Sequence, residues 1–115
     1  GITNASKIGQ LADTSTIRFT QSSISASFSN GRPLQGTIDA LRSGELLPGG
    51  LPPIRVFENN NLTFTLDNRR LFAAHQAGVP INTIPATAGE VARESWKFTS
   101  PNQGSIVCVV RGCVQ

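Results

Sequence analysis

Residues 62–74 are the most informative part of the sequence, because two kinds of secondary structure meet within them. They read Leu62-Thr63-Phe64-Thr65-Leu66-Asp67-Asn68-Arg69-Arg70-Leu71-Phe72-Ala73-Ala74. Apolar and polar residues alternate up to Leu66, which is typical of a half-buried strand. From Leu71 the apolar residues follow a helical spacing, and we predict a helix over residues 69–77 that ends at Gly78. A strand therefore leads directly into a helix at residues 67–70.

This junction carries one carboxylate and two adjacent guanidinium groups. Arg69 and Arg70 stand where the dipole of the predicted helix favours negative charge, so their positive charges conflict with their position. A bound oxyanion would remove the conflict, because arginine side chains and free backbone N–H groups both bind phosphate oxygens. We therefore predict a phosphate-binding, catalytic site with Asp67 and Arg70 as catalytic residues and Arg69 in contact with the substrate. The alternatives are that Asp67 caps the helix and that Arg70 pairs with Glu90 or Glu94.

The residues before the junction predict two strands and two helices. Residues 16–20 alternate and indicate a strand, and the four-residue spacing of Ile24 and Phe28 favours a short helix after Ser22 or Ser23. Pro33 opens a second helix, which Gly44 stops. Its apolar stripe consists of Leu34, Ile38 and Leu41. Residues 54–57 form a strand, which the turn at residues 59–61 joins to the strand at 62–66 as a hairpin.

The residues after the junction predict further strands around one more helix. We expect strands at residues 81–84, 96–99 and 105–110, the last of them buried because it is apolar on both faces. The spacing of Thr87 and Glu90 matches a capping box and starts a helix between the first two of these strands. The predicted order of elements gives a single small α+β domain, with one mixed β-sheet and flanking helices.

Composition limits the class of protein. The chain has 115 residues, of which 38% are hydrophobic and 15% charged, enough for one globular domain. Residues 1–15 are polar and weakly patterned, so we interpret them as a linker or fragment edge, and residues 16–115 as the domain. No apolar run approaches the roughly 20 residues of a membrane span, and no signal-peptide pattern is present. The net charge of +3 and the predominance of arginine over lysine favour a polyanionic partner.

Neither the cysteines nor the histidine indicate a metal or cofactor site. Cys108 and Cys113 are five residues apart, which is no zinc or thioredoxin spacing. They could form a local disulfide, or Cys108 could be a small apolar residue of the core. The carboxylates are scattered, and His75 is the single histidine, so no metal-ligand pattern exists. We therefore expect no metal and no cofactor.

Four residues outside the junction complete the predicted site. His75 is the side chain best suited to proton transfer near neutral pH, although its place beside the apolar stripe also fits the edge of a core. Lys97 and Thr99 share one face of the predicted strand 96–99, where Lys97 could act as an acid and Thr99 could bind substrate. Arg18 could line the same groove. The alternative for these last three is an ordinary exposed strand face.

The middle of the chain resembles the ParB/sulfiredoxin fold over roughly residues 16 to 86. The resemblance rests on the segment 53–56, the hairpin, the arginine junction, the helix 71–78 and the following Ile84-Pro85, which stand in that family's order. The phosphate motif of that family is Gly-x-x-Arg, and residues 67–70 keep its final arginine as Arg70. Asp67 stands in place of the glycine, and a carboxylate there repels a nucleotide phosphate. The reactive cysteine of sulfiredoxin is absent from this motif, which further argues against sulfiredoxin-type ATP chemistry.

Three short motifs look more like the C-terminal toxin domains of bacterial polymorphic and contact-dependent growth inhibition proteins. They are residues 66–71, residues 96–99 and Arg111-Gly112. The resemblance implies a nuclease that is exported as part of a larger cell-surface protein and acts in the cytoplasm of the target cell. It also implies a cognate immunity protein, which we expect to be acidic because the toxin is basic.

The first functional hypothesis is a metal-independent ribonuclease, with transfer RNA as substrate by analogy with such toxins. RNA carries its own nucleophile, the 2′-OH, whereas hydrolysis of DNA usually relies on metal-activated water. In this hypothesis Asp67 or His75 acts as base, His75 or Lys97 as acid, and the arginines hold the phosphate. The alternatives are a deoxyribonuclease toxin, a non-catalytic nucleic-acid-binding module of the ParB type, and a nucleotide-dependent enzyme.

Overall fold

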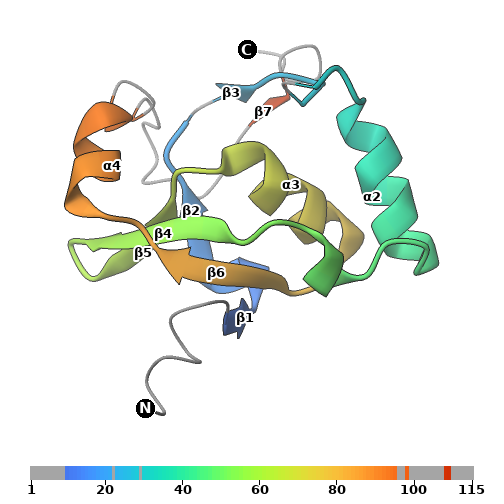
Figure 1. The fold of residues 1–115 in the computed structure, drawn as a ribbon, viewed down its shortest axis with the longest axis horizontal. Helices are drawn as coiled ribbons and strands as arrows, with labels where there is room; N and C mark the ends of the chain where they lie inside the picture. Colours follow the sequence, from blue (N-terminus) through green and yellow to red (C-terminus); the bar gives the residue numbers. More distant parts are fainter. Residues whose placement is uncertain (1–9, 22, 29, 96–97, 99–107, 110–115) are drawn as a thin grey trace.

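The computed structural model describes residues 10–21, 23–28, 30–95, 98 and 108–109. Its helices and strands are, in chain order, β1 (Gln10–Ala12), β2 (Ile17–Phe19), β3 (Ser23–Ile24), α2 (Leu34–Ser43), β4 (Ile54–Asn59), β5 (Leu62–Thr65), α3 (Asn68–Ala77), β6 (Ile81–Pro85), α4 (Ala88–Arg93) and β7 (Cys108–Val109) (Figure 1). Two short 3-10 helices, η1 (Thr14–Thr16) and η2 (Pro48–Gly50), precede β2 and β4.

Five strands form one mixed sheet in the order β1-β6-β4-β5-β2. The predicted hairpin is present, since β4 and β5 are antiparallel with Phe57 opposite Phe64. Asn60 and Asn61 have φ angles of 53° and 65°, the left-handed conformation that a tight hairpin turn requires. Strand β6 is parallel to β4, β2 is parallel to β5, and β1 is antiparallel to β6. This arrangement confirms the prediction of a small α+β domain with a mixed sheet.

The five-stranded sheet is curled, because its two edge strands are close neighbours in the sequence. A flat sheet would hold β1 and β2 about 19 Å apart, since four strand spacings of about 4.8 Å separate them. The five steps from Ala12 to Ile17 reach about 17 Å even when fully extended, and part of that length is wound into η1. The edges must therefore approach one another, and η1 spans the gap between them in contact with α3.

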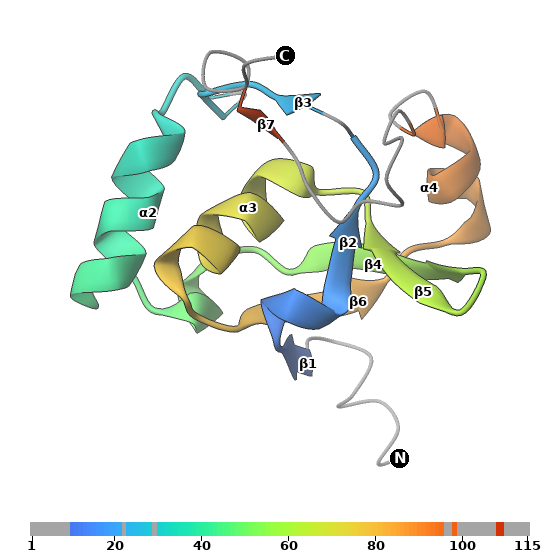
Figure 2. The same ribbon diagram turned by 180° about the vertical axis from the view of Figure 1, so that it is seen from behind.

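Helix α3 lies against the sheet, and α2 packs on the outer side of α3 (Figures 1 and 2). One apolar cluster joins the sheet to α3 and includes the fully buried residues Ile54, Leu71 and Ile81. A second cluster joins α2 to α3. Its buried residues are Ile24, Leu34, Ile38, Leu41 and Ala73. The apolar stripe predicted for the helix after Pro33 is thus confirmed as the buried face of α2.

Glycines end both long helices as predicted. Gly44 has a φ of 82° after α2, and Gly78 has a φ of 72° after α3. Both angles lie in the left-handed region that glycine adopts without steric cost. Pro33 is the N-cap of α2, and Thr87 starts α4 with the predicted capping box. The local signals for the ends of these helices are therefore confirmed.

Two predictions about the first third of the chain differ from the structure. The short helix expected after Ser22 or Ser23 is wrong, because Ser23–Ile24 form β3, which pairs with β7 from the other end of the chain. Partners so distant in sequence override the local helical spacing. The boundary at residue 15 also differs, because Gln10–Ala12 form an edge strand of the sheet and Thr14 is buried.

Several predictions concern residues outside those that the structure describes. Of the expected strand at residues 96–99 only Phe98 is described, and of the expected buried strand at residues 105–110 only β7. Cys113 and the side chain of Cys108 also lie outside the described residues, so their pairing stays open. Among the helices of the described residues, none has the length and apolar character needed to cross a membrane.

Candidate functional site

The candidate site is the α3 corner, which we define as Arg55 together with residues 67–70, where β5 leads into α3. Asp67 occupies the N-cap position, but its side chain makes no capping hydrogen bond to the helix. The predicted capping role of this side chain is therefore wrong, although its position at the helix start is right. The carboxylate turns instead towards Arg55 and Arg70, whose guanidinium groups form charge-assisted hydrogen bonds and ion pairs with it.

Two arginines hold the carboxylate of Asp67. Arg55 donates to it from its backbone N at 2.7 Å, from Nε at 3.0 Å and from Nη2 at 2.7 Å. Nη2 of Arg70 lies 3.0 Å from Oδ1 of the same carboxylate. Burial raises the pKa of Asp67, but the hydrogen bonds from Arg55 and the charges of both arginines outweigh it. The net result is a pKa below the ordinary value of 3.8, so Asp67 is ionised at neutral pH.

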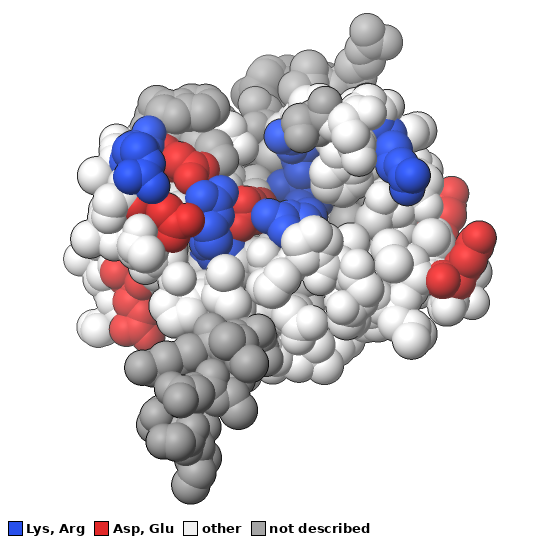
Figure 3. Space-filling view, viewed as in Figure 1, with Lys and Arg blue, Asp and Glu red and all other residues white. Residues whose placement is uncertain are grey.

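Arg55 links the start of α3 to α4. Its guanidinium pairs with Glu94 through both terminal nitrogens, and its Nη1 lies 3.4 Å from Oε2 of Glu90. The pKa of Arg55 is raised, chiefly by its hydrogen bond to Asp67. Three carboxylates thus face the guanidinium groups of Arg55 and Arg70. Figure 3 shows the result at the surface, where acidic and basic side chains mix from α4 to the start of α3.

Arg69 and Arg70 are anchored to different parts of the chain. Nη1 of Arg69 donates to the carbonyl oxygen of Ser27 at 2.7 Å. Nη1 of Arg70 donates to the carbonyl oxygens of Pro52 and Pro53 at 3.0 and 3.1 Å. Glu90 and Glu94, proposed as alternative partners of Arg70, pair with Arg55 instead. Both predicted arginines therefore lie at the corner, where Arg70 is in an ion pair and Arg69 is held by a backbone carbonyl.

A buried amide ties the end of β2 to the start of α3. Oδ1 of Asn68 accepts the backbone N–H of Thr20 at 2.8 Å, and its Nδ2 donates to the hydroxyl of Thr20 at 2.9 Å. The hydroxyl of Thr20 in turn donates to the carbonyl oxygen of Thr65 in β5 at 2.9 Å. Asn68 is 2% exposed, so these bonds satisfy a side chain that has no access to water.

The remaining predicted residues do not join the corner within the described part of the chain. His75 is exposed in the last turn of α3, and a helix of 3.6 residues per turn places it about 140° around the axis from Arg70. Its charge contributes to the lowered pKa of Asp13, whose main cause is the backbone N–H of Ser15. Arg18 lies on β2 opposite Phe64. Lys97 and Thr99 fall outside the described residues.

Sequence reasoning missed Arg55 and Asn68, the two residues that organise the corner. The signal for Arg55 was its place between Ile54 and Val56, because alternation along a strand directs it to the opposite face. The signal for Asn68 was a polar residue between Leu66 and Leu71, both of which are fully buried. Neither signal identifies the partner, because Glu94 and Thr20 lie 39 and 48 residues away in sequence.

Among the described residues, no group of three or more histidine, cysteine, aspartate or glutamate side chains could hold a metal ion. Asp67, Glu90 and Glu94 converge on the guanidinium of Arg55, so a cation already occupies the place between them.

Comparisons with protein-family models, with curated proteins and with solved structures found no match to this chain.

Proposed function

We propose that this chain is a metal-independent ribonuclease domain with its phosphate site at the α3 corner. The observation that carries the proposal is the start of α3, where the side chain of Asp67 leaves the first turn uncapped and two arginines stand at residues 69 and 70. The backbone N–H groups of a first helical turn have no acceptor within the helix, and they suit a phosphate oxygen. Arg69 is the residue best suited to meet that phosphate, because a neutral carbonyl, not a carboxylate, holds it.

The proposed chemistry assigns positioning rather than proton abstraction to Asp67. A carboxylate with a lowered pKa is a weak base, and its oxygens are already occupied by Arg55 and Arg70. The 2′-OH of RNA supplies the nucleophile, and His75 and Lys97 are the proposed proton-transfer residues. His75 lies about 8 Å along the α3 axis from Arg70. The phosphate that is cleaved would therefore have to lie near His75, and the α3 corner would hold a neighbouring phosphate of the same RNA strand.

The wider proposal concerns origin and partners. We propose a ParB/sulfiredoxin-like fold in the version resembling toxin domains of contact-dependent growth inhibition proteins. In that setting the domain would be exported within a larger cell-surface protein and would cleave transfer RNA in the cytoplasm of the target cell. An acidic immunity protein would neutralise it. The mixed sheet, the net charge of +3 and the arginines of the corner are compatible with this proposal.

A non-catalytic nucleic-acid-binding module is the second candidate, and one observation favours it. The corner combines bound carboxylates with anchored arginines, while His75 lies on another side of α3 near Asp13. This arrangement can hold a phosphate without supplying a proton acceptor beside it. A deoxyribonuclease is a weaker candidate, because DNA has no 2′-OH to act as an internal nucleophile.

Cleavage assays on matched arginine variants test the proposal. The purified chain is incubated with total transfer RNA and with plasmid DNA, each with and without EDTA. The variants are Arg69→Ala and Arg70→Ala, with Arg42→Ala as the control. Arg42 is a close match to Arg69, because it too donates to a backbone carbonyl, that of Gln76, at 3.1 Å. RNA cleavage that survives EDTA, and that falls at least tenfold in Arg69→Ala but not in Arg42→Ala, is expected.

Three other outcomes would redirect the assignment. Binding of RNA without cleavage would favour the second candidate. Cleavage of DNA that EDTA abolishes would favour a metal-dependent deoxyribonuclease. Equal cleavage by Arg69→Ala, Arg70→Ala and Arg42→Ala would remove the α3 corner from the mechanism, and His75→Ala and Lys97→Ala would then be compared to locate the active residues.

A further inference from the structure

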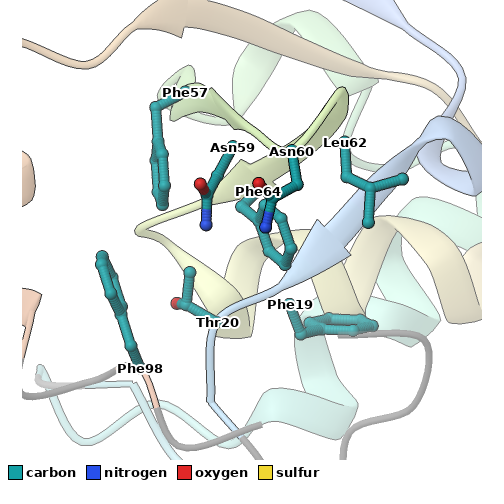
Figure 4. A pocket seen from close by; sticks show the side chains of 8 residues that line it. All are labelled: Phe19, Thr20, Phe57, Asn59, Asn60, Leu62, Phe64 and Phe98. Atoms are coloured by element: carbon teal, nitrogen blue, oxygen red, sulfur yellow. The ribbon is translucent and has the colours of Figure 1, made fainter. Parts of the chain in front are cut away.

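A second surface feature lies beside the α3 corner and has no role in the chemistry described so far. A pocket of about 210 Å³ opens on the β4–β5 hairpin, and we call it the hairpin pocket (Figure 4). Its principal lining residues are Thr20, Phe57, Asn59, Asn60, Phe64 and Phe98. Pockets for drug-sized ligands usually hold about 300–1,000 Å³. The hairpin pocket is smaller and suits a single planar ring system.

Three phenylalanines give the hairpin pocket a flat aromatic wall. Phe57 and Phe64 face each other across the hairpin, with ring centroids 5.9 Å apart and planes inclined by 23°. Phe98 stacks on Phe57 at 5.4 Å with an inclination of 21°. Phe98 is 40% exposed, which is costly for so large an apolar side chain. Near-parallel rings that stay open to solvent offer a face on which another planar ring can stack.

Two amide side chains supply a polar edge to the same space. Figure 4 shows the amide ends of Asn59 and Asn60 directed towards the rings of Phe57 and Phe64. Both residues are exposed, and within the part of the chain that the structure describes neither amide makes a hydrogen bond. An asparagine side chain offers two donors and one acceptor oxygen, which match the mixed donor and acceptor edge of a nucleobase.

The hairpin pocket adjoins the α3 corner through the hydrogen bonds between Thr20 and Asn68. Thr20 lines the pocket and is hydrogen-bonded to Asn68 at the start of α3. Arg18 lies opposite Phe64 in the sheet, and Phe64 lies opposite Phe57, so the three side chains project on one face of three neighbouring strands. A guanidinium beside a row of aromatic rings is the combination that proteins use for single-stranded nucleic acid.

We propose that the hairpin pocket binds one unpaired nucleobase of an RNA whose phosphate lies at the α3 corner. The inference rests on the proposed function and adds to it the element that selects the base. The base stacks on the aromatic wall that Phe57, Phe64 and Phe98 form, and the amides of Asn59 and Asn60 read its polar edge. An aromatic side chain of a protein partner fits less well, because its single N–H or O–H group offers less to two amides than the several donors and acceptors of a nucleobase edge.

Titrations with mononucleotides test the hairpin pocket independently of cleavage. The four ribonucleoside 5′-monophosphates are added to the ¹⁵N-labelled full chain, and the side-chain amide signals of Asn59 and Asn60 are followed by NMR. Ribose 5-phosphate is the matched probe without a base. We expect the nucleotides to shift these signals, with a preference for one base, and ribose 5-phosphate to leave them unchanged.

Two pairs of variants separate the hairpin pocket from general effects on the fold. Phe57→Leu removes the aromatic face and keeps an apolar side chain, and Phe28→Leu makes the same change beside α2, away from the pocket. Asn60→Gly removes one amide, and Asn61→Gly is its match, because both positions have a positive φ that glycine tolerates. We expect the affinity for a four-nucleotide RNA to fall about tenfold in Phe57→Leu and severalfold in Asn60→Gly, with both controls unchanged.

The outcomes distinguish this inference from the ribonuclease proposal. Nucleotide binding at Asn59 and Asn60 without any RNA cleavage would support the hairpin pocket while the ribonuclease proposal fails. RNA cleavage with an unchanged base preference in Phe57→Leu and Asn60→Gly would overturn the pocket and leave the ribonuclease standing. Equal shifts with ribose 5-phosphate would also overturn the pocket, as would tighter binding of N-acetyltryptophanamide than of any nucleotide, because that result indicates a protein partner.

Discussion

Helices α3 and α4 both begin at a residue that prefers the N-cap position, but they use it differently. At α4 the hydroxyl of Thr87 accepts the backbone N–H of Glu90 at 3.1 Å, and Glu90 accepts the backbone N–H of Thr87 at 2.9 Å. At α3 the carboxylate of Asp67 makes no such bond and binds Arg55 and Arg70. The capping bond is therefore absent at α3 because the carboxylate of Asp67 has charged partners.

The two helix starts also differ in whether the backbone N–H groups of the first turn are left without a side-chain acceptor. The first turn of α4 is capped by its own residues, since the side chains of Thr87 and Glu90 each accept the backbone N–H of the other residue. The first turn of α3 is left without a side-chain cap in a group of arginines and carboxylates. An N-cap residue without a capping bond, and positive charges in a first helical turn, both depart from local sequence preferences. Such departures are more often found at functional sites than elsewhere. Three substitutions and one change of pH test this difference between the two helix starts, in decreasing order of expected effect.

The largest effect is expected from Asp67→Asn. We expect the free energy of unfolding to fall by about 3 kcal/mol, because an amide leaves the arginines without their anion in a site where Asp67 is only 9% exposed. Urea denaturation of the variant measures this loss. The control is Asp39→Asn, an exposed carboxylate on α2 that accepts from Gln35 and should change stability by no more than about 0.5 kcal/mol. Equal losses of stability in the two variants would show that the ion pairs of Asp67 with Arg55 and Arg70 do not stabilise the fold.

A smaller loss of about 2 kcal/mol is expected from Asn68→Ala. The substitution leaves the backbone N–H of Thr20 buried without its acceptor. The matched change is Asn30→Ala, which removes an exposed amide that accepts from Arg32 and should cost about 0.5 kcal/mol. Hydrogen exchange provides a second measurement, and the amide of Thr20 should exchange faster only in Asn68→Ala. Unchanged protection there would contradict the proposed tie between β2 and α3.

Loss of the α4 cap should cost less than either change at α3. Thr87→Ala is expected to destabilise the chain by about 1 kcal/mol, because it removes the acceptor for the N–H of Glu90. Thr87→Ser keeps a hydroxyl at the same place and should retain most of the stability. Thermal unfolding of the two variants side by side gives the difference. If Thr87→Ala proved more damaging than Asp67→Asn, the contrast between the two helix starts would be reversed.

The smallest effect is expected from moderate acidification. Folding lowers the pKa of Asp67 below 3.8 and that of Glu90 below 4.5, the latter chiefly through the N–H of Thr87. Groups with a lowered pKa stabilise the fold fully above their ordinary values and lose that contribution as the pH falls through the folded values. These two groups should therefore add no pH dependence between pH 7 and 5, and a loss below about pH 4. Urea midpoints against pH for the wild type and Asp67→Asn would show it, since the variant should lose less in acid.

Local patterns predict most of the secondary structure but little of its arrangement. The hairpin followed from alternation and three asparagines, and α2 followed from an apolar stripe between Pro33 and Gly44. Strand β3 was missed because Ser23–Ile24 carry a helical spacing, and only their pairing with residues 108–109 makes them extended. The order of the strands in the five-stranded sheet could not be predicted either, because it depends on contacts between segments that are far apart in sequence.

The position of the candidate site in the sequence was predictable, but its ion pairs and hydrogen bonds were not. The charge conflict at Arg69 and Arg70 led to the start of α3, because it needs only the sequence of one junction and the helix dipole. The ion pairs were not predictable, since Arg55 selects Asp67 and Glu94 from seven acidic residues only after the sheet and α4 are in place. His75 differs from the two arginines, because closeness in sequence to Arg70 does not bring it to the same side of the helix, and its catalytic role stays a prediction.

The pairing of the first strand with a late one has a consequence for synthesis. Gln10 and Thr83 are cross-strand partners separated by 73 positions. At a translation rate of about 5–20 residues per second, β1 emerges from the ribosome on the order of ten seconds before β6 can reach it. Over that interval its backbone donors and acceptors are open to any other extended chain, including a second nascent copy. The earliest of the five strands of this sheet thus waits for the latest, β6, and mispairing competes with folding during that interval.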